Sequence, residues 1–187
     1  LATIFDFFDG WFARKLKSGS NFGAELDSLS DFVSFGVAPS FLIYLWSTHS
    51  IGSLGWGATL FFVICSALRL ARFTADIYIT NKPIDNNEYF IGVPSPAAAG
   101  LMLIPLFIYF EFNLNIFQNG YLNLLTTLVI GFMMISKIPT ISLKSININQ
   151  KYKTWIFLIF VIVCVALISK IWLTLVIVFS LYLLSIF

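Results

Sequence analysis

Four aspartates lie within one polar stretch near the start of a chain that is otherwise mostly apolar. They are Asp6, Asp9, Asp27 and Asp31, four of the six aspartates in the sequence. The first two are three residues apart and the last two are four apart, so each pair shares one face if its segment is helical. The glycine, serine and asparagine residues of 19–23 predict a turn between the pairs. Such a turn would bring two helices back antiparallel with their acidic faces opposed.

Carboxylates gathered in this way favour the binding of divalent cations. Four like charges repel one another strongly, and two divalent cations would cancel that charge. Oxygen ligands without histidine or thiolate favour Mg²⁺, Mn²⁺ or Ca²⁺, and paired metals about 4 Å apart commonly hold both sides of a phosphoryl displacement. The alternative is that the aspartates only solvate helix ends or form ion pairs with Arg14, Lys15 and Lys17.

The composition indicates that these residues belong to a membrane protein. Of 187 residues, 59% are hydrophobic and 11% are charged, whereas about a quarter of the residues in ordinary globular chains are charged. Apolar stretches recur at about the twenty-residue length that crosses a bilayer, and the mean hydropathy is +0.91. Acids inside membrane helices are costly and usually functional, which favours function over mere solvation. The net charge of +2 does not suggest a nucleic-acid partner.

The apolar runs and the polar breaks between them predict an all-α, polytopic bundle of seven membrane helices. Backbone groups within lipid must be satisfied internally, which favours helices. The last two helices form either a hairpin or one broken span. Cys65 and Cys164 lie in apolar runs and are interpreted as packing residues, and the single His49 argues against histidine-based catalysis. The predicted helices span residues 1–16, 24–46, 54–75, 93–112, 120–136, 154–169 and 171–187.

The basic residues predict the orientation in the membrane. If the first helix ends on the cytoplasmic side, strict alternation puts loops 76–92 and 137–153 on that side. Loops 47–53 and 113–119 then lie outside, and they contain no lysine or arginine. Ten of the eleven basic residues, all but Lys170, lie at or near the cytoplasmic face on this arrangement, in agreement with the positive-inside rule. We expect a multi-pass protein of the cytoplasmic (inner) membrane whose acidic stretch faces the cytoplasm.

The residues from Asp6 to Asp31 resemble the signature of the CDP-alcohol phosphotransferase family. That signature, D-x2-D-G-x2-A-R-x8-G-x3-D-x3-D, has eight fixed positions over 26 residues, and this sequence fills all of them. Chance agreement at this density is negligible. The matching residues are Asp6, Asp9, Gly10, Ala13, Arg14, Gly23, Asp27 and Asp31.

The resemblance implies a role for each matching residue. It implies that the four aspartates hold two divalent cations, Mg²⁺ or Mn²⁺, and that Asp31 is also the general base for the acceptor alcohol. Gly10 and Gly23 lack side chains and would let a nucleotide approach closely, and Arg14 can hold phosphate oxygens through two hydrogen bonds. A homodimer is implied as well. The residues implied to bind the cytidine diphosphate group are Asp6, Gly10, Ala13, Arg14, Gly23 and Asp27.

Three further stretches resemble the phosphatidylserine synthase branch of this family: AELDSLSDFVSFGVAP (24–39), ALRLARF (67–73) and FIGVPSPAAAG (90–100). The resemblance covers 1–105, and the remainder matches only in being apolar helices. We therefore expect one transmembrane domain over the whole chain, with catalytic helices in 1–105 and additional membrane helices in 106–187. Family members have a further helix before this point, and Leu1 lies in an apolar run without an initiator methionine, so we expect an N-terminally truncated fragment.

Four more polar residues are candidates for substrate contact. Arg69 and Arg72 are three apart and share one face near the cytoplasmic end of their helix. Their guanidinium groups can bind the carboxylate of serine or the pyrophosphate of CDP-diacylglycerol, and the alternative is snorkelling toward lipid headgroups. Ser34 and Ser95 are candidates for the same site, with helix capping or interhelical hydrogen bonding as the alternative.

The activity implied by the resemblance is transfer of a phosphatidyl group from CDP-diacylglycerol to the hydroxyl of L-serine, with release of CMP. Glycerol 3-phosphate or an inositol phosphate is the alternative acceptor, and their phosphates would call for extra basic residues near the site. A membrane transporter would also place carboxylates inside helices. It would more naturally show paired repeats and helices broken near the midplane, and the sequence indicates neither.

Overall fold

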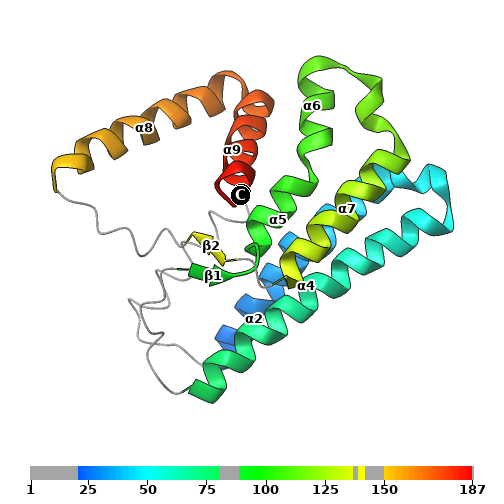
Figure 1. Cartoon of the computed structure of the whole chain (residues 1–187), viewed down its shortest axis with the longest axis horizontal. Helices are drawn as coiled ribbons and strands as arrows, with labels where there is room; N and C mark the ends of the chain where they lie inside the picture. Colours follow the sequence, from blue (N-terminus) through cyan, green and yellow to red (C-terminus); the bar gives the residue numbers. More distant parts are fainter. Residues whose placement is uncertain (1–20, 81–88, 137–138, 142–149, 187) are drawn as a thin grey trace.

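Helices make up almost all of the chain that the structure, a computed structural model, describes (Figure 1). The described residues are 21–80, 89–136, 139–141 and 150–186. The predicted all-α fold is confirmed, and the helix predicted over 1–16 lies outside the described residues. The elements in chain order are α2 (Asn21–Phe32), the π-helical turn η1 (Val33–Val37), α3 (Ala38–Trp46), the 3-10 turn η2 (Thr48–Ile51), α4 (Ser53–Thr80), β1 (Tyr89–Ile91), α5 (Ser95–Met102), α6 (Ile104–Phe112), the 3-10 turn η3 (Asn115–Gln118), α7 (Gly120–Ile135), β2 (Pro139–Ile141), α8 (Gln150–Ser169) and α9 (Ile171–Ile186).

Helices α2 and α3, joined by η1, form one helical run that folds back along α4, and α7 packs against α4 (Figure 1). Within the described chain, the segments Leu26–Trp46 and Ser53–Arg72 are each long and apolar enough to cross a bilayer. The pair α5 and α6 makes a third span if it is counted as one. The remaining apolar helices α7, α8 and α9 are shorter in their apolar parts.

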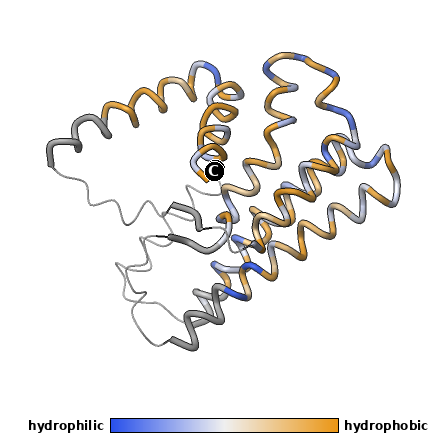
Figure 2. The backbone as a smooth tube through the Cα atoms, in the orientation of Figure 1, coloured by the Kyte–Doolittle hydropathy of each residue, from blue (hydrophilic) through white to orange (hydrophobic). Residues whose placement is uncertain are grey.

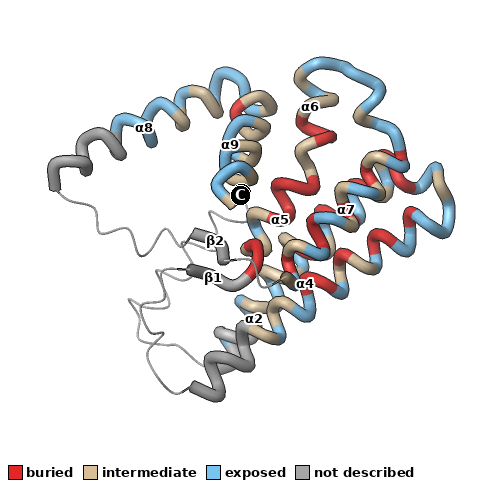
Figure 3. The backbone as a smooth tube through the Cα atoms, viewed as in Figure 1, coloured by how far each residue is buried: buried red, intermediate tan, exposed pale blue. Residues whose placement is uncertain are grey.

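Apolar side chains cover much of the outer surface of these helices. Figure 2 shows hydrophobic residues along the helices and polar residues at several of the turns, and Figure 3 shows that many helical positions are exposed. Ile168 in α8 is 88% exposed, and Leu184 in α9 is 71% exposed. An apolar surface of this extent is unfavourable in water but suits lipid. The surface and the spans together indicate a multi-pass membrane protein.

The span of α5 and α6 is bent into two helices, where the sequence predicted one helix over 93–112. The two helices meet at Leu103 at an angle of 41°. Pro105 has no N–H to donate to the carbonyl of Leu101, and its ring crowds that carbonyl. Proline is a usual cause of a sharp kink, so the bend follows from this one residue.

A short two-stranded sheet, which the sequence did not predict, joins the segments 76–92 and 137–153. Strand β1 pairs antiparallel with β2, with Phe90 opposite Thr140. Gly92 follows β1 with a φ of 81°, and a side chain there would meet the Met134 carbonyl oxygen at 2.6 Å. The positive φ and the close backbone both require glycine. The pairing brings β1 and β2 to the same end of the molecule, as alternation across the membrane predicted for the two loops that contain them.

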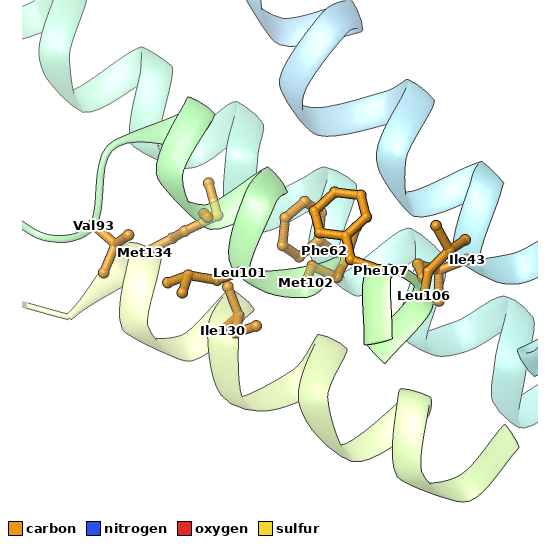
Figure 4. Packing of buried hydrophobic residues seen from close by; sticks show 10 residues of the cluster. Ile43, Phe62, Val93, Leu101, Met102, Leu106, Phe107, Ile130 and Met134 are labelled. Atoms are coloured by element: carbon orange, nitrogen blue, oxygen red, sulfur yellow. The ribbon is translucent and has the colours of Figure 1, made fainter. Parts of the chain in front are cut away.

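The hydrophobic core lies between α3, α4, α5, α6 and α7 (Figure 4). Phe62 of α4 and Met102 of α5 are fully buried within it. Helix α9 packs on α6 through aromatic rings, because Phe107 has its ring centroid 5.8 Å from that of Trp172 and 6.4 Å from that of Phe179. The last helix is therefore part of the same packed body as the helices that precede it.

Lys170 marks the junction between α8 and α9, which meet there at a sharp angle (Figure 1). Its Nζ lies 3.6 Å from Oε1 of Glu111 at the end of α6. This contact puts Lys170 at the same end as the loop that follows α6, which is the predicted outer side. Two separate helices are therefore observed in place of a single broken span.

Asn123 ties together the two loops at that end. Its side chain is 0% exposed, and Nδ2 lies within hydrogen-bonding distance of Ser47 Oγ (2.9 Å), the Phe117 carbonyl oxygen (2.7 Å) and the Asn119 carbonyl oxygen (3.0 Å). The Ser47 hydroxyl in turn donates to the Gln118 carbonyl oxygen at 2.8 Å. The two loops that alternation assigned to the outer side are thus in contact.

Replacing Asn123 with alanine is expected to lower the free energy of unfolding by about 2 kcal/mol, because buried acceptors lose their donor. The melting temperature of the purified protein in detergent should fall by about 5 °C. Thr126→Val on the same helix is the matched control and should lower it by less than half as much. An unchanged melting temperature for Asn123→Ala would show that this network does not hold the loops.

Candidate active site

The antiparallel helices bring the acidic and the basic candidate residues to one end of the bundle. Asp27 and Asp31 lie in the first turns of one membrane span, and Arg69 and Arg72 lie in the last turn of the next. Helices α2 and α4 run in opposite directions and are in contact (Figure 1). Alternation of the predicted helices puts the two groups on the same side of the membrane, and the packing agrees.

The acidic part of the site stands on α2. Asp27 and Asp31 are one helical turn apart, so their carboxylates share one face. Asp27 is exposed and Asp31 is partly buried. Gly23, one turn before Asp27, is exposed and has no side chain that would cover this face of α2.

Two carboxylates one turn apart fit the oxygen-ligand chemistry of Mg²⁺ or Mn²⁺. They are half of the predicted ligand set, and the described residues contain no group of three or more His, Cys, Asp or Glu side chains that could hold a metal. The metal-binding assignment therefore stays a prediction. The predicted site residues that lie outside the described residues are Asp6, Asp9, Gly10, Ala13 and Arg14.

The basic part of the site links α4 to two other helices. Arg69 Nη1 donates to Ser95 Oγ at 2.9 Å, and Ser95 is the first residue of α5. Arg72 Nη1 donates to the Ile135 carbonyl oxygen at 3.5 Å, at the end of α7. Interhelical hydrogen bonding, one of the two roles considered for Ser95, is therefore observed.

The described residues leave part of the Arg69 guanidinium unsatisfied. Among them, Nε is buried without a hydrogen-bond partner. Arg72 and the phenol of Tyr182 act on the Arg69 charge electrostatically. A buried charge is costly unless it is paired, so this arrangement suits an anionic group bound beside Arg69.

Ser34 lies in η1, the π-helical turn that follows the acidic face. It is partly buried, and η1 contacts both α4 and α5, the helices that carry Arg69 and Ser95. Single π-turns inside α-helices occur often at functional sites. Ser34 is thus at the correct end of the bundle, and a contact with substrate stays a prediction.

Tyr182 is a residue of this region that the sequence did not single out. It belongs to α9, in the part of the chain interpreted only as additional membrane helices. A lone tyrosine in an apolar helix is indistinguishable by spacing from a core residue. Only the packing of α9 on α5 and α6 brings it near Arg69.

Comparison with known proteins adds a finding of a different kind. The family model of the CDP-alcohol phosphatidyltransferases matches residues 1–183. The chain belongs to this family. The CDP-alcohol phosphatidyltransferase family is the one that the aspartate signature indicated, so that prediction is confirmed.

Curated relatives of the chain carry the name CDP-diacylglycerol–serine O-phosphatidyltransferase. The relative from Methanocaldococcus jannaschii is 37% identical over 171 residues, which are 90% of this chain and 71% of the relative. The relative from Bacillus subtilis is 38% identical over 133 residues, 71% of this chain and 66% of the relative. The relative from Mycobacterium leprae is 33% identical over 151 residues, 81% of this chain and 50% of the relative. The chain thus spans about half the length of the mycobacterial relative.

Proposed function

We propose that the protein transfers the phosphatidyl group of CDP-diacylglycerol to the hydroxyl of L-serine, giving phosphatidylserine and CMP. The observation that carries the proposal is the presence of Asp31 and Arg69 at one end of two adjacent membrane helices in a member of this family. A carboxylate can take the proton of an alcohol, and a guanidinium can bind the phosphate or carboxylate of a substrate. The names of the relatives support serine as the acceptor.

Asp27 and Asp31 would supply half of the ligands for two divalent cations, and Asp6 and Asp9 would supply the rest. When bound, the cations would neutralise negative charge on the pyrophosphate in the transition state. Gly23 leaves room beside α2 for the cytidine diphosphate group. The remaining residues proposed for that pocket are Gly10, Ala13 and Arg14.

Asp31 is the proposed general base. It takes the proton of the serine hydroxyl, and the serine oxygen forms a bond to the phosphorus that carries the diacylglycerol. The bond from that phosphorus to the CMP oxygen breaks, and CMP leaves with the electron pair of that bond. Asp31 is partly buried in the first turns of a membrane span, so it can serve a lipid substrate whose acyl chains stay in the bilayer.

Arg69 and Arg72 are proposed to bind an anionic part of a substrate, either the pyrophosphate of the donor or the carboxylate of serine. Snorkelling would expose the guanidinium to headgroups, whereas Nε of Arg69 is buried. For Arg69, the burial therefore favours binding over snorkelling. Ser95 holds one end of the Arg69 guanidinium and so sets its orientation, and Ser34 is a further polar candidate beside it.

An acceptor comparison tests the proposed function. Purified protein in detergent with CDP-diacylglycerol and Mn²⁺ or Mg²⁺ should release CMP and form phosphatidylserine when L-serine is added. Glycerol 3-phosphate and inositol phosphates should give less than about a hundredth of that rate, since a site that binds a carboxylate lacks partners for the additional phosphate. A higher rate with a phosphorylated acceptor would contradict the assignment of serine.

Removal of the metal separates an enzyme from a transporter. We expect EDTA to abolish product formation and added Mn²⁺ or Mg²⁺ to restore it, because four carboxylates without cations would repel the pyrophosphate. Product formation that is unaffected by chelation would contradict the two-metal site. A protein that moves a solute but forms no lipid product under any of these conditions would be a transporter.

The orientation and assembly are part of the same proposal. The active-site end is proposed to face the cytoplasm in the inner membrane, because ten of the eleven basic residues are assigned to that face and basic residues are enriched on the cytoplasmic side. The protein is also proposed to form a homodimer, as the family resemblance implied.

A further inference from the structure

Gly36 in η1 brings the helical run of α2 and α3 close to α4. A Cβ atom added at Gly36 would lie 2.5 Å from Ser66 Oγ and 2.9 Å from Ser66 Cβ. Gly36 is buried, and Ser66 is 1% exposed. The backbone of η1 therefore rests directly on Ser66, and a side chain at position 36 would push the two helices apart.

This contact lies about one turn from the candidate residues on both helices. Ser66 precedes Arg69 by three residues, which is about 4.5 Å along the axis of α4. Gly36 follows Asp31 by five residues, roughly the length of the π-turn. Because the helices are antiparallel, a contact at this point sets how far Asp31 stands from Arg69 along their axes.

The π-turn also rotates α3 relative to α2 about the helix axis. The Ala38 N–H donates to the Val33 carbonyl oxygen, so the turn holds one residue more than an α-turn. One extra residue rotates the following helix by about 100°. The face of α2 that carries Asp31 is thereby offset from the face of α3 that packs into the core through Ile43. The same turn contacts α5, which begins with Ser95.

We infer that Gly36 and Ser66 form a register contact that positions Asp31 relative to Arg69. Neither residue is proposed to touch a substrate. The inference rests on the proposed function for its effect on activity, whereas the contact itself can be measured without any reaction.

The first test is the activity of Gly36→Ala. The added methyl group must displace Ser66 and its helix, and a misplacement of about 1 Å can slow a positioned reaction considerably. We expect kcat for serine transfer to fall by about tenfold, with little change in the KM for serine or in CDP binding, because the nucleotide residues precede the turn. The matched control is Gly57→Ala on α4, where nothing lies within 4 Å of the added methyl group and kcat should be unchanged.

The second test is rescue from the opposite helix. Ser66→Gly in the Gly36→Ala background places the glycine of this contact on α4 instead of η1. The double variant has room for the new methyl group and should recover most of kcat. Ser66→Ala removes only Oγ and leaves Cβ, which would lie 2.9 Å from the new methyl group, so it should restore less. A rescue that fails for both, or follows the reverse order, would overturn the register contact.

The third test measures the register itself. Spin labels at Leu29→Cys and Leu68→Cys, both exposed positions, in a Cys164→Ala background report the spacing of α2 and α4. Gly36→Ala should shift the distance distribution, and Ser66→Gly should return it to the native one. Ser66→Thr, which enlarges the contact from α4, should shift it as well and replaces Gly36→Ala if that variant does not fold.

The two readouts separate the inference from the proposed function. A native protein without serine transfer would defeat the proposed function, and the label distances would still decide on the contact. An unshifted distance in Gly36→Ala and Ser66→Thr would overturn the contact. A shifted distance with unchanged kcat would overturn its role in positioning Asp31.

Discussion

Asp31→Asn is expected to abolish measurable transfer to serine, with a loss of about 10³-fold or more in kcat, as for removal of a general base. The amide has the shape of the carboxylate but cannot accept the proton of the serine hydroxyl. It also contributes no negative charge to the proposed cation site. Much of the CDP binding should remain, because the nucleotide pocket is assigned to other residues.

The measurement is CMP release under saturating CDP-diacylglycerol and serine, with CDP binding determined on the same preparation. Ser30→Ala, the exposed neighbour of Asp31 on α2, is the matched control and should keep native activity. Robust CMP release by Asp31→Asn would refute the assignment of the base. Loss of CDP binding together with activity would show that Asp31 acts mainly through the nucleotide site.

Arg69→Gln is expected to lower kcat/KM by about a hundredfold, which corresponds to the loss of a charge-assisted contact in a partly buried site. Glutamine can still accept or donate hydrogen bonds near Ser95, so the change isolates the charge and the fork of the guanidinium. The KM values identify the partner. A raised KM for serine indicates binding of the carboxylate, and a raised KM for CDP-diacylglycerol indicates binding of the pyrophosphate.

Two further variants are compared with Arg69→Gln. Arg69→Lys keeps the charge but loses the planar fork, and we expect an intermediate loss. Ser95→Ala frees the guanidinium without removing it, and we expect a smaller loss than for Arg69→Gln. A melting temperature should be measured for Arg69→Gln to confirm that it folds. If the folded variant has native kinetic constants, Arg69 does not bind substrate, and snorkelling toward lipid headgroups is the better interpretation.

The positions of the helices could be predicted from the sequence because the lipid fixes the length of an apolar run. Helices 24–46, 120–136 and 171–187 correspond closely to α2–α3, α7 and α9. The sequence also predicts which loops lie at the same end of the bundle, because each span reverses the direction of the chain. Because of this pairing, the sequence alone predicts that Asp31 and Arg69 lie at one end of the bundle.

Local backbone geometry was harder to predict. The π-turn at Gly36 and the bend at Pro105 interrupt runs that are uniformly apolar, so hydropathy alone does not reveal them. Proline gives a signal for the bend, whereas Gly36 in the π-turn packs against Ser66, which is thirty residues away in the sequence. The position of Tyr182 near Arg69 could not be predicted either, because it depends on how α9 packs on α5 and α6.

Four aspartates are proposed to hold a pair of divalent cations at this end of the bundle. The direct measurement is the number of Mn²⁺ ions bound per chain, determined by electron paramagnetic resonance in the presence of CDP. We expect two ions whose spectrum shows that they are close neighbours, and the loss of this pair in Asp27→Asn. Mn²⁺ binding that is absent in the native protein, or unaltered in Asp27→Asn, would contradict this proposal.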